Sequence, residues 1–229
     1  MKPPAALLPH FYTLTGNLLA ERTLEFDGWS IGRTQRARRE TFQVGGKGIN
    51  VARMLRRLAA PHTALCFAGG ATGAECAAWL ASSGCAHRIF PTTAATRVGT
   101  VVRTTAGAAA AQPETTFLGP DAPVDAAALQ NCADFLDVQP PGQVLAICGS
   151  LPGWESDDFN SLRAALRRWL ARGHLVADTY GPALAWLASQ ALDLIKINAH
   201  ELRSIPLAKD ATPPPPTSRW VVTDGPGPV

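Results

Sequence analysis

Short apolar runs alternate along the chain with segments whose apolar residues recur at the spacing of a helix. This alternation predicts a mostly parallel β-sheet with helices on both faces, because parallel strands need crossover connections that are usually helical. The predicted strands are 64–68, 144–148, 175–178, 192–197 and 220–223. The predicted helices are 48–60, 74–83, 125–137, 157–171, 182–189 and 199–204. The fold class expected from this pattern is α/β.

The ends of the predicted helix 157–171 are marked by particular side chains. Ser156 precedes Asp157 and Asp158, which predicts an N-cap followed by acidic residues in the first turn. Gly173 follows the last apolar residues, which predicts a C-terminal stop.

A second group of strand-like segments lies apart from this alternating series. Segments 97–103 and 114–118 predict a hairpin with a low-complexity, alanine-rich tip at 106–111. A strand around 23–29 would extend it. Together these segments predict a small sheet that is suited to covering a substrate.

Composition narrows the class of protein. The chain has 229 residues, 17% of them charged, and a formal net charge of +3. This length can bury a sizeable core, and the composition is typical of a compact protein rather than a disordered one. Nucleic-acid binding requires basic residues gathered on one face, and the one dense basic cluster, at 33–39, reads as a solvated loop. No nucleic-acid partner is predicted.

The cysteines indicate neither a zinc site nor a disulfide framework, because no Cys-x-x-Cys pair occurs. A reducing cytoplasm is the location they favour. No segment approaches the roughly 20 apolar residues that span a bilayer, and the N-terminus lacks the apolar run of a signal peptide. No membrane association is predicted. The five cysteines are Cys66, Cys76, Cys85, Cys132 and Cys148.

A glycine-rich turn runs directly into the first predicted helix. Gly45, Gly46 and Gly48 allow the backbone to approach a small polar ligand, and the helix N-terminus that follows offers unpaired N–H groups. Lys47 adds a cation, and Asn50 adds a donor and an acceptor. An ordinary tight turn is the alternative. The segment is not a Walker A loop, because no Ser or Thr follows the lysine.

This turn belongs to a series of segments spread over nearly the whole chain. They are YTLTGN at 12–17 with ERT at 21–23, GGKGINVARML at 45–55, Thr96-Arg97 with Arg103, GSLP at 149–152, DTYG at 178–181, LIKINAHEL at 194–202 and VVTDG at 221–225. In this order the series resembles the PfkB (ribokinase-like) carbohydrate kinases, specifically their phosphofructokinase and tagatose-6-phosphate kinase branch. The resemblance implies one ribokinase-like α/β domain over 1–229, with a β lid formed by about 22–44 and 97–118.

The resemblance also implies a substrate site. Glu21 would hold a sugar hydroxyl, and the glycine-rich turn would line the sugar pocket. Arginine's planar fork suits phosphate oxygens, so Arg97 would meet the phosphate already present on the substrate. Arg103 and Lys47 are further candidates for that phosphate, although Arg103 is also explained as a surface charge of the lid. The substrate-binding residues implied are Glu21, Gly45, Gly46, Lys47, Asn50, Arg97 and Arg103.

A nucleotide site is implied at the carboxyl ends of the last strands. Asn198 and Glu201 match the family's Asn-x-x-Glu, which organises magnesium and the ATP phosphates, with Glu201 acting on magnesium through water. Lys196, Thr223 and Gly225 would face the nucleotide. The alternative for Asn-x-x-Glu is a helix cap with a first-turn acid. Asp178 is explained equally well by capping of the next helix and by contact with a ligand.

Two departures from the family pattern alter these expectations. Glu21 stands where the branch has aspartate, which places the carboxylate one methylene farther from the backbone. The resembling kinases also continue past 221–225 into a Gly-Ala-Gly-Asp segment whose aspartate is the catalytic base. The chain ends at Val229 without that segment. We therefore expect the C-terminal part of the fold to be missing, no catalytic base to be identifiable, and phosphoryl transfer by this chain to be impaired.

The function implied is phosphorylation of a sugar phosphate by ATP and Mg²⁺, with fructose 1-phosphate, fructose 6-phosphate or tagatose 6-phosphate as acceptor. Two alternatives stay open at this point. One is a non-catalytic sugar-phosphate or nucleotide-binding homologue, and the other is a kinase of an unphosphorylated sugar or a nucleoside. The resemblance also implies a homodimer formed through the β lid.

Overall fold

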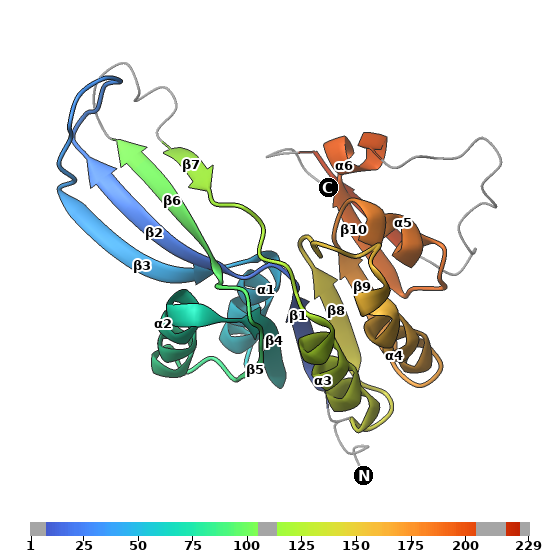
Figure 1. Cartoon of the computed structure of the whole chain (residues 1–229). Coiled ribbons are helices and arrows are strands. Elements are labelled where there is room, and N and C mark those ends of the chain that lie inside the picture. The colour runs from blue at the N-terminus through green and yellow to red at the C-terminus, as the bar shows by residue number, and fades with distance from the viewer. Residues whose placement is uncertain (1–7, 105–113, 205–218, 225–229) are drawn as a thin grey trace, which may run out of the picture.

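The computed structural model describes residues 8–104, 114–204 and 219–224, and they form two sheets (Figure 1). The larger sheet has seven strands in the order β11-β10-β9-β8-β1-β4-β5, and every neighbouring pair is parallel. The α/β class predicted from the apolar pattern is confirmed. Its strands are β1 (Phe11–Thr15), β4 (His62–Ala68), β5 (His87–Pro91), β8 (Val144–Cys148), β9 (His174–Asp178), β10 (Leu194–Asn198) and β11 (Arg219–Thr223).

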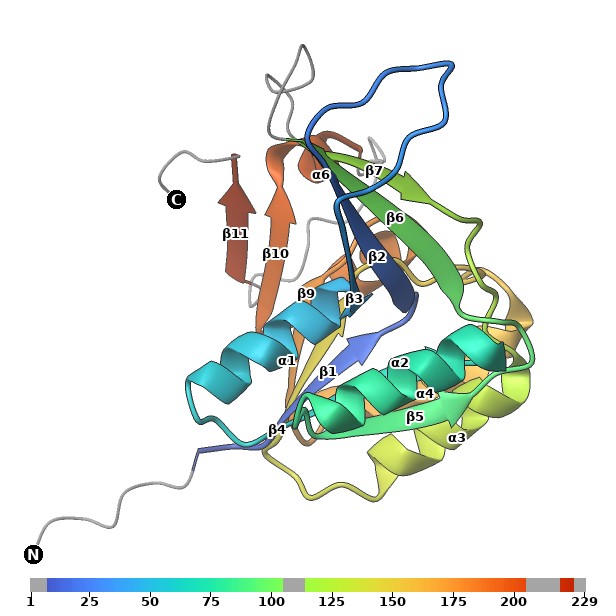
Figure 2. The ribbon, with the colours of Figure 1, turned by 90° about the vertical axis from the view of Figure 1, so that its left-hand side faces the viewer.

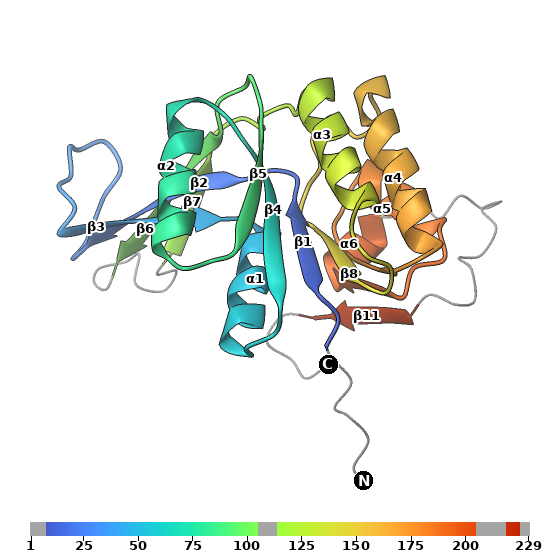
Figure 3. The same ribbon diagram turned by 90° about the horizontal axis from the view of Figure 1, so that it is seen from below.

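Helices cover both faces of this sheet (Figures 2 and 3). On one face lie α1 (Lys47–Arg57) and α2 (Gly70–Ser82). On the other face lie α3 (Ala126–Asp137), α4 (Asn160–Leu170) and α5 (Pro182–Ala188). The short α6 (Ala199–Ser204) follows β10 directly. Of the described helices, none combines the length and the apolar character needed to cross a bilayer.

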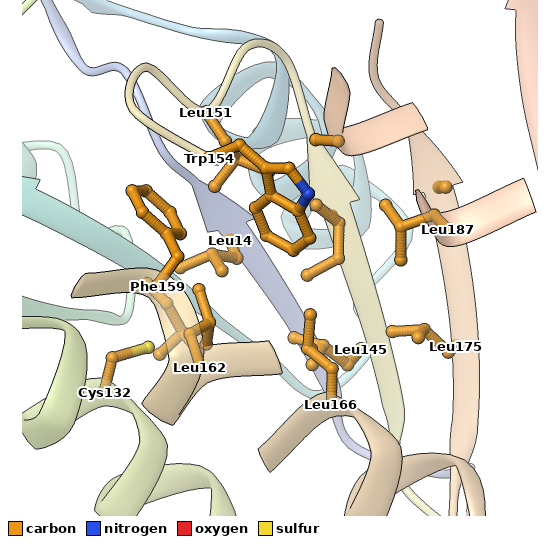
Figure 4. Close-up of a cluster of buried hydrophobic side chains, with 14 of the residues drawn as sticks. Leu14, Cys132, Leu145, Leu151, Trp154, Phe159, Leu162, Leu166, Leu175 and Leu187 are labelled. Atoms are coloured by element: carbon orange, nitrogen blue, oxygen red, sulfur yellow. The ribbon is translucent and has the colours of Figure 1, made fainter. Parts of the chain in front are cut away.

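Strand β4 shows why the sheet carries two separate cores. Successive side chains of a strand point to opposite faces, and those of β4 divide accordingly. Cys66 packs with α1 and α2, whereas Leu65 and Phe67 pack with the aromatic core under α3 and α4. In that larger core Phe159 and Trp154 face the leucines of the sheet (Figure 4). Near-continuous apolar strands are expected of a sheet that is buried on both faces.

The second sheet, called here the small sheet, projects beyond the edge of the first (Figure 1). Its order is β3-β2-β6-β7, with β2 parallel to β6 and the two outer pairs antiparallel. The alanine-rich tip expected at 106–111 lies outside the described residues. The strands are β2 (Leu19–Phe26), β3 (Arg39–Gly45), β6 (Arg97–Thr104) and β7 (Glu114–Leu118).

Several predicted boundaries differ from those observed. Helix α2 begins at Gly70, four residues before the predicted start, because the run Gly69-Gly70-Ala71-Thr72-Gly73 reads as a turn but continues as helix. The predicted helix 157–171 is divided into a 3₁₀ turn, η2 (Asp157–Phe159), and α4. The expected N-cap at Ser156 is confirmed, since its hydroxyl accepts a hydrogen bond from the Asp158 N–H at 3.2 Å.

Candidate active site

A cleft of about 190 Å³ opens where the carboxyl ends of β1 and β8 meet the base of the small sheet. Ligands of open α/β sheets bind outside the carboxyl ends of the parallel strands, so this is the expected place for a site. Four of the substrate residues predicted from the sequence line it, namely Gly46, Lys47, Asn50 and Arg97. The remaining lining residues are Thr15, Asn17, Leu19, Leu118, Cys148, Gly149, Ser150 and Tyr180.

The glycine-rich turn brings the start of α1 into direct contact with β1. Gly46, the N-cap, has φ of 132°, which favours glycine, and a Cβ there would lie 2.7 Å from Cγ2 of Thr15. Gly48 is buried, and a Cβ at that position would overlap Oγ1 of Thr15. The glycines therefore serve close packing of helix on strand, and this packing sets Lys47 and Asn50 at the cleft.

Lys47 is held by two carboxylates from distant parts of the chain. Its Nζ lies 3.0 Å from Oδ1 of Asp178, at the end of β9, and 3.1 Å from Oε1 of Glu201, on α6. The ammonium also lies 5.4 Å from the centre of the Tyr180 ring. Burial acts to lower the pKa of Lys47, but the hydrogen bonds to Asp178 and Glu201 outweigh burial and raise it. Lys47 is therefore a charged, oriented cation in the cleft.

Asp178 joins two lysines rather than capping a helix. Its second oxygen, Oδ2, lies 3.4 Å from Nζ of Lys196 on β10. The N-cap of α5 is Gly181, and no side chain caps that helix. The capping explanation of Asp178 is therefore not what the structure shows. The backbone carbonyl of Asp178 also accepts a hydrogen bond from the Gly149 N–H at 2.8 Å, which ties β9 to the cleft loop after β8.

Arg97, at the start of β6, belongs to a second polar cluster in the cleft. Its Nη1 lies 3.0 Å from Oδ1 of Asp121, and its Nη2 lies 3.5 Å from the Asn17 carbonyl. Asn17 donates from Nδ2 to the same Asp121 oxygen at 2.7 Å and to Oγ of Ser150 at 2.9 Å. Sequence reasoning missed Asp121, because its Gly-Pro-Asp-Ala-Pro context reads only as a turn and the contact depends on the tertiary fold.

Glu21 and Gly45 lie together beside the cleft. On β2, Glu21 accepts a close hydrogen bond from Nε2 of Gln43, and Oε1 of Gln43 accepts one from Arg53 at 3.5 Å. A Cβ on Gly45 would lie 3.1 Å from Oε2 of Glu21, so glycine leaves the carboxylate its space. Both residues are on the small sheet next to Leu19, which lines the cleft.

Arg103 is not brought together with Arg97. It lies six residues further along β6, roughly 20 Å away at the rise of an extended strand. Its Nε donates to Oε2 of Glu114 at 2.7 Å, and both side chains are half-exposed. This placement is the one expected of a surface charge on the small sheet.

At the carboxyl end of β10, Asn198 and Glu201 hydrogen-bond to each other as a capping box. The Asn198 Oδ1 accepts from the Glu201 N–H at 2.7 Å, and the Glu201 Oε2 accepts from the Asn198 N–H at 2.9 Å. Thr223 pairs with Asn198 across β10 and β11, and Lys196 lies two residues before Asn198. The helix cap that was the alternative explanation of Asn-x-x-Glu is therefore formed, and Glu201 contacts Lys47 in addition. Gly225 lies outside the described residues.

All five cysteines are free thiols in buried positions. Cys148 lines the cleft, and burial raises its pKa to about 12. The thiol of Cys148 is therefore protonated near neutral pH and is a poor nucleophile.

The chain is similar to several known kinases. It is 30% identical over 197 residues to ATP-dependent 6-phosphofructokinase isozyme 2 of Mycobacterium tuberculosis, a match covering 85% of this chain and 56% of that protein. It is 26% identical over 192 residues to 1-phosphofructokinase of Bacillus subtilis, covering 83% of this chain and 60% of the relative. The chain thus spans less than two thirds of the length of these relatives.

Solved structures show the same fold. Escherichia coli phosphofructokinase-2 in complex with fructose 6-phosphate aligns with a TM-score of 0.81 at 23% identity, over 96% of this chain and 75% of that one. The tetrameric inhibited form of the same enzyme aligns with a TM-score of 0.76 at 26% identity, over 86% and 64%. The predicted ribokinase-like fold is therefore confirmed.

The profile of the pfkB family of carbohydrate kinases matches residues 17–214, which include the glycine-rich turn, Arg97 and the Asn198–Glu201 pair. Because this match extends over most of the chain, the chain belongs to the pfkB family of carbohydrate kinases.

Proposed function

We propose that this chain binds a sugar phosphate in the cleft and functions in its phosphorylation by ATP and Mg²⁺. The observation that carries the proposal is the pair of cations, Lys47 and Arg97, that line one cleft and come from separate elements, α1 and β6. Phosphoryl transfer depends on positioning and on neutralising charge, and both are supplied by fixed cations. The proposed acceptors are fructose 1-phosphate, fructose 6-phosphate and tagatose 6-phosphate.

The acceptor's two ends would meet different parts of the cleft. Arg97 would bind the phosphate already on the sugar, because a partly buried guanidinium offers several donors to phosphate oxygens. Glu21 and Asn50 would bind sugar hydroxyls, with Gly45 and Gly46 allowing the ring to approach the backbone. Lys47 lies at the start of α1, where helix N–H groups also favour an anion.

ATP and magnesium would lie toward β10 and β11. The side-chain oxygens of Asp178, Asn198 and Glu201 are suitable magnesium ligands. Magnesium is commonly held by one or two carboxylates together with substrate phosphates. The Lys47 ammonium contacts two of these carboxylates, so the pair already accommodates a cation. We propose Glu201 as the magnesium residue, with Lys196, Asn198, Thr223 and Gly225 on the nucleotide. Bound magnesium would neutralise charge on the ATP phosphates.

We propose that the small sheet acts as a lid and that the two sheets belong to a single domain over 1–229. Leu19, Arg97 and Leu118 line the cleft from this sheet. Val98 and Phe117 are exposed apolar residues on its strands and are the proposed contact of a homodimer through the lid. Sedimentation of the wild-type chain beside Phe117→Ser tests this contact, since the dimer fraction would fall in the variant.

We propose a cytoplasmic location, which fits the five free, buried cysteines and the proposed use of ATP.

The test of function is ADP release from ATP and Mg²⁺ against a panel of phosphorylated and free sugars, with protein of confirmed intact mass. Acceptor-dependent ADP that is lost in Glu201→Gln supports the kinase and names its substrate. Saturable phosphosugar binding without ADP indicates a non-catalytic binding protein instead. Turnover of a free sugar or a nucleoside that is insensitive to Arg97→Ala indicates a different acceptor class.

A further inference from the structure

The ion pair between Arg97 and Asp121 differs in exposure from the two ion pairs that Lys47 forms in the cleft. Asp178 and Glu201, the partners of Lys47, have side chains that are 21% and 12% exposed. The side chain of Asp121 is 56% exposed, whereas that of Arg97 is only 14% exposed. A half-exposed carboxylate that leaves its partner is readily hydrated, and exposed pairs contribute little to stability. Arg97 is therefore fixed, and its counter-ion is replaceable.

Arg97 also has hydrogen-bonding capacity that Asp121 does not use. Its Nε is buried without a hydrogen-bond partner among the described residues, and only one Asp121 oxygen contacts its Nη1. The neighbouring Asn17, which is 5% exposed, likewise has a buried Oδ1 without a described partner. A phosphate group presents three oxygens and can satisfy more of Arg97's donors than one carboxylate oxygen does.

The backbone around Asp121 is held at both ends. The N–H of Gly119 donates to the Val98 carbonyl at 2.8 Å, and the side chain of Asp125 accepts from the Thr93 N–H at 2.8 Å. Prolines on both sides of Asp121 restrict the dihedral angles further. Exchange of the Arg97 counter-ion therefore requires only a rotation of the Asp121 side chain toward solvent, with the segment between β7 and α3 in place.

We propose that Asp121 is an internal counter-ion that pairs with Arg97 and competes for it with the ligand's phosphate. The Asp121 carboxylate and a phosphate bound to the same guanidinium would repel each other, so binding of the phosphate requires Asp121 to withdraw. A doubly charged phosphate displaces it more effectively than a singly charged carboxylate does. Asp121 thereby lowers the affinity for every anion and increases discrimination in favour of phosphate. The inference deepens the proposed function and rests on it for the identity of the sugar.

Titration of the 229-residue chain with inorganic phosphate at low ionic strength tests this role. Asp121→Asn keeps the shape and the acceptor oxygen but removes the charge. We expect its dissociation constant for phosphate to be about two- to fivefold lower than that of the wild type, the size of effect of an exposed ion pair. Arg97→Ala should abolish this gain. Glu114→Gln, which removes a comparable carboxylate from Arg103, should leave phosphate binding unchanged.

The direction of the change separates competition from simple orientation of Arg97. If Asp121 only positions the guanidinium, Asp121→Asn and Asp121→Ala both weaken phosphate binding, and the inference is overturned. Unchanged binding, or no binding by any variant, overturns it as well. Thermal unfolding of each variant shows that the fold is retained, and Asp121→Ala serves as the second test if Asp121→Asn does not fold.

The proposed function is tested separately, by comparing the binding of fructose 6-phosphate with that of fructose to the wild-type chain. If phosphate affinity rises in Asp121→Asn while the two sugars bind alike, the counter-ion inference stands and the sugar-phosphate proposal fails. If the phosphosugar is preferred and Asp121→Asn changes nothing, the proposed function stands and the inference fails.

Discussion

Lys47 and Asp178 lie 131 positions apart in the sequence, yet the ammonium of one is 3.0 Å from the carboxylate of the other. The contact joins the start of α1 to the end of β9, and Glu201 extends it to α6. The Lys47 ammonium thus joins helix and strand ends from separate parts of the chain. Because Lys47 is partly buried among carboxylates, loss of its charge should destabilise the folded state more than the unfolded chain.

The first prediction concerns alkaline pH. The folded-state pKa of Lys47 is raised above its ordinary value of 10.5, so the stabilising contribution of the lysine is complete below that pH and is lost as the pH rises through the folded pKa. We expect the free energy of unfolding of the wild type to fall more steeply above pH 10.5 than that of Lys47→Met. Urea unfolding of both proteins from about pH 9 to 12 measures the difference. Parallel pH profiles of the two proteins would show that the Lys47 ion pairs contribute nothing to stability.

A second prediction concerns the packing of α1 on β1. Gly48→Ala would place a methyl group against Oγ1 of Thr15 and 3.3 Å from Cβ of Cys148, and overpacking of this kind costs about 1–3 kcal/mol. The Thr15 hydroxyl has no hydrogen-bond partner among the described residues, so Thr15→Ala should cost less. The double variant should regain most of the lost stability, as measured by a denaturation cycle. Strict additivity would contradict the proposed clash.

The end of the same helix carries a prediction of opposite sign. Ala59 has φ of 52°, and among the described residues no other non-glycine residue has a positive φ. The N–H groups of Ala59 and Ala60 bond to the carbonyls of Arg56 and Leu55, which is the Schellman arrangement that favours glycine at this position. Ala59→Gly should raise the free energy of unfolding by about 0.5–1 kcal/mol. Ala60→Gly is the matched control and should lower stability or leave it unchanged.

Asp125 carries a prediction about acid stability. Hydrogen bonds from the Thr93 and Ala128 N–H groups lower its pKa below the ordinary 3.8. Its contribution is present above pH 3.8 and is lost as the pH falls through the lowered value. Asp125→Ala should cost about 1 kcal/mol near neutral pH through loss of the α3 cap, and the cost should shrink in acid. Asp134→Ala, in the same helix, should change stability little at either pH.

Much of the fold follows from local pattern. Strand β8 occupies the predicted residues, because Val-Leu-Ala-Ile-Cys is an uninterrupted apolar run between turn residues. Strand β5 was not predicted, because it is an edge strand that begins with His87 and Arg88 and ends in Pro91, so it lacks the apolar character of the central strands. The start of α2 was also missed, because glycines there serve a helix instead of ending one.

The cations of the candidate site could be predicted from the sequence, whereas their partners could not. Lys47 lies within a glycine-rich turn, and Arg97 begins a strand-like segment. Asp121 pairs with Arg97 across 24 positions, and Asp178 pairs with Lys47 across 131. Such contacts depend on the order of strands in the sheet, which no local spacing encodes. Whether Arg97 and Arg103 act together also depends on strand length, which sets them at opposite ends of β6.

Binding of fructose 6-phosphate to the wild-type chain, measured by calorimetry beside fructose and beside Arg97→Ala, tests the central claim most directly. We expect saturable binding of the phosphosugar, little binding of fructose, and a loss of about tenfold or more in Arg97→Ala, because a charged hydrogen bond contributes about 1.5–3 kcal/mol. Arg88→Ala, on the edge strand β5, should bind as the wild type does. Equal binding of both sugars, or equal effects of the two arginine variants, would contradict a phosphate site at Arg97.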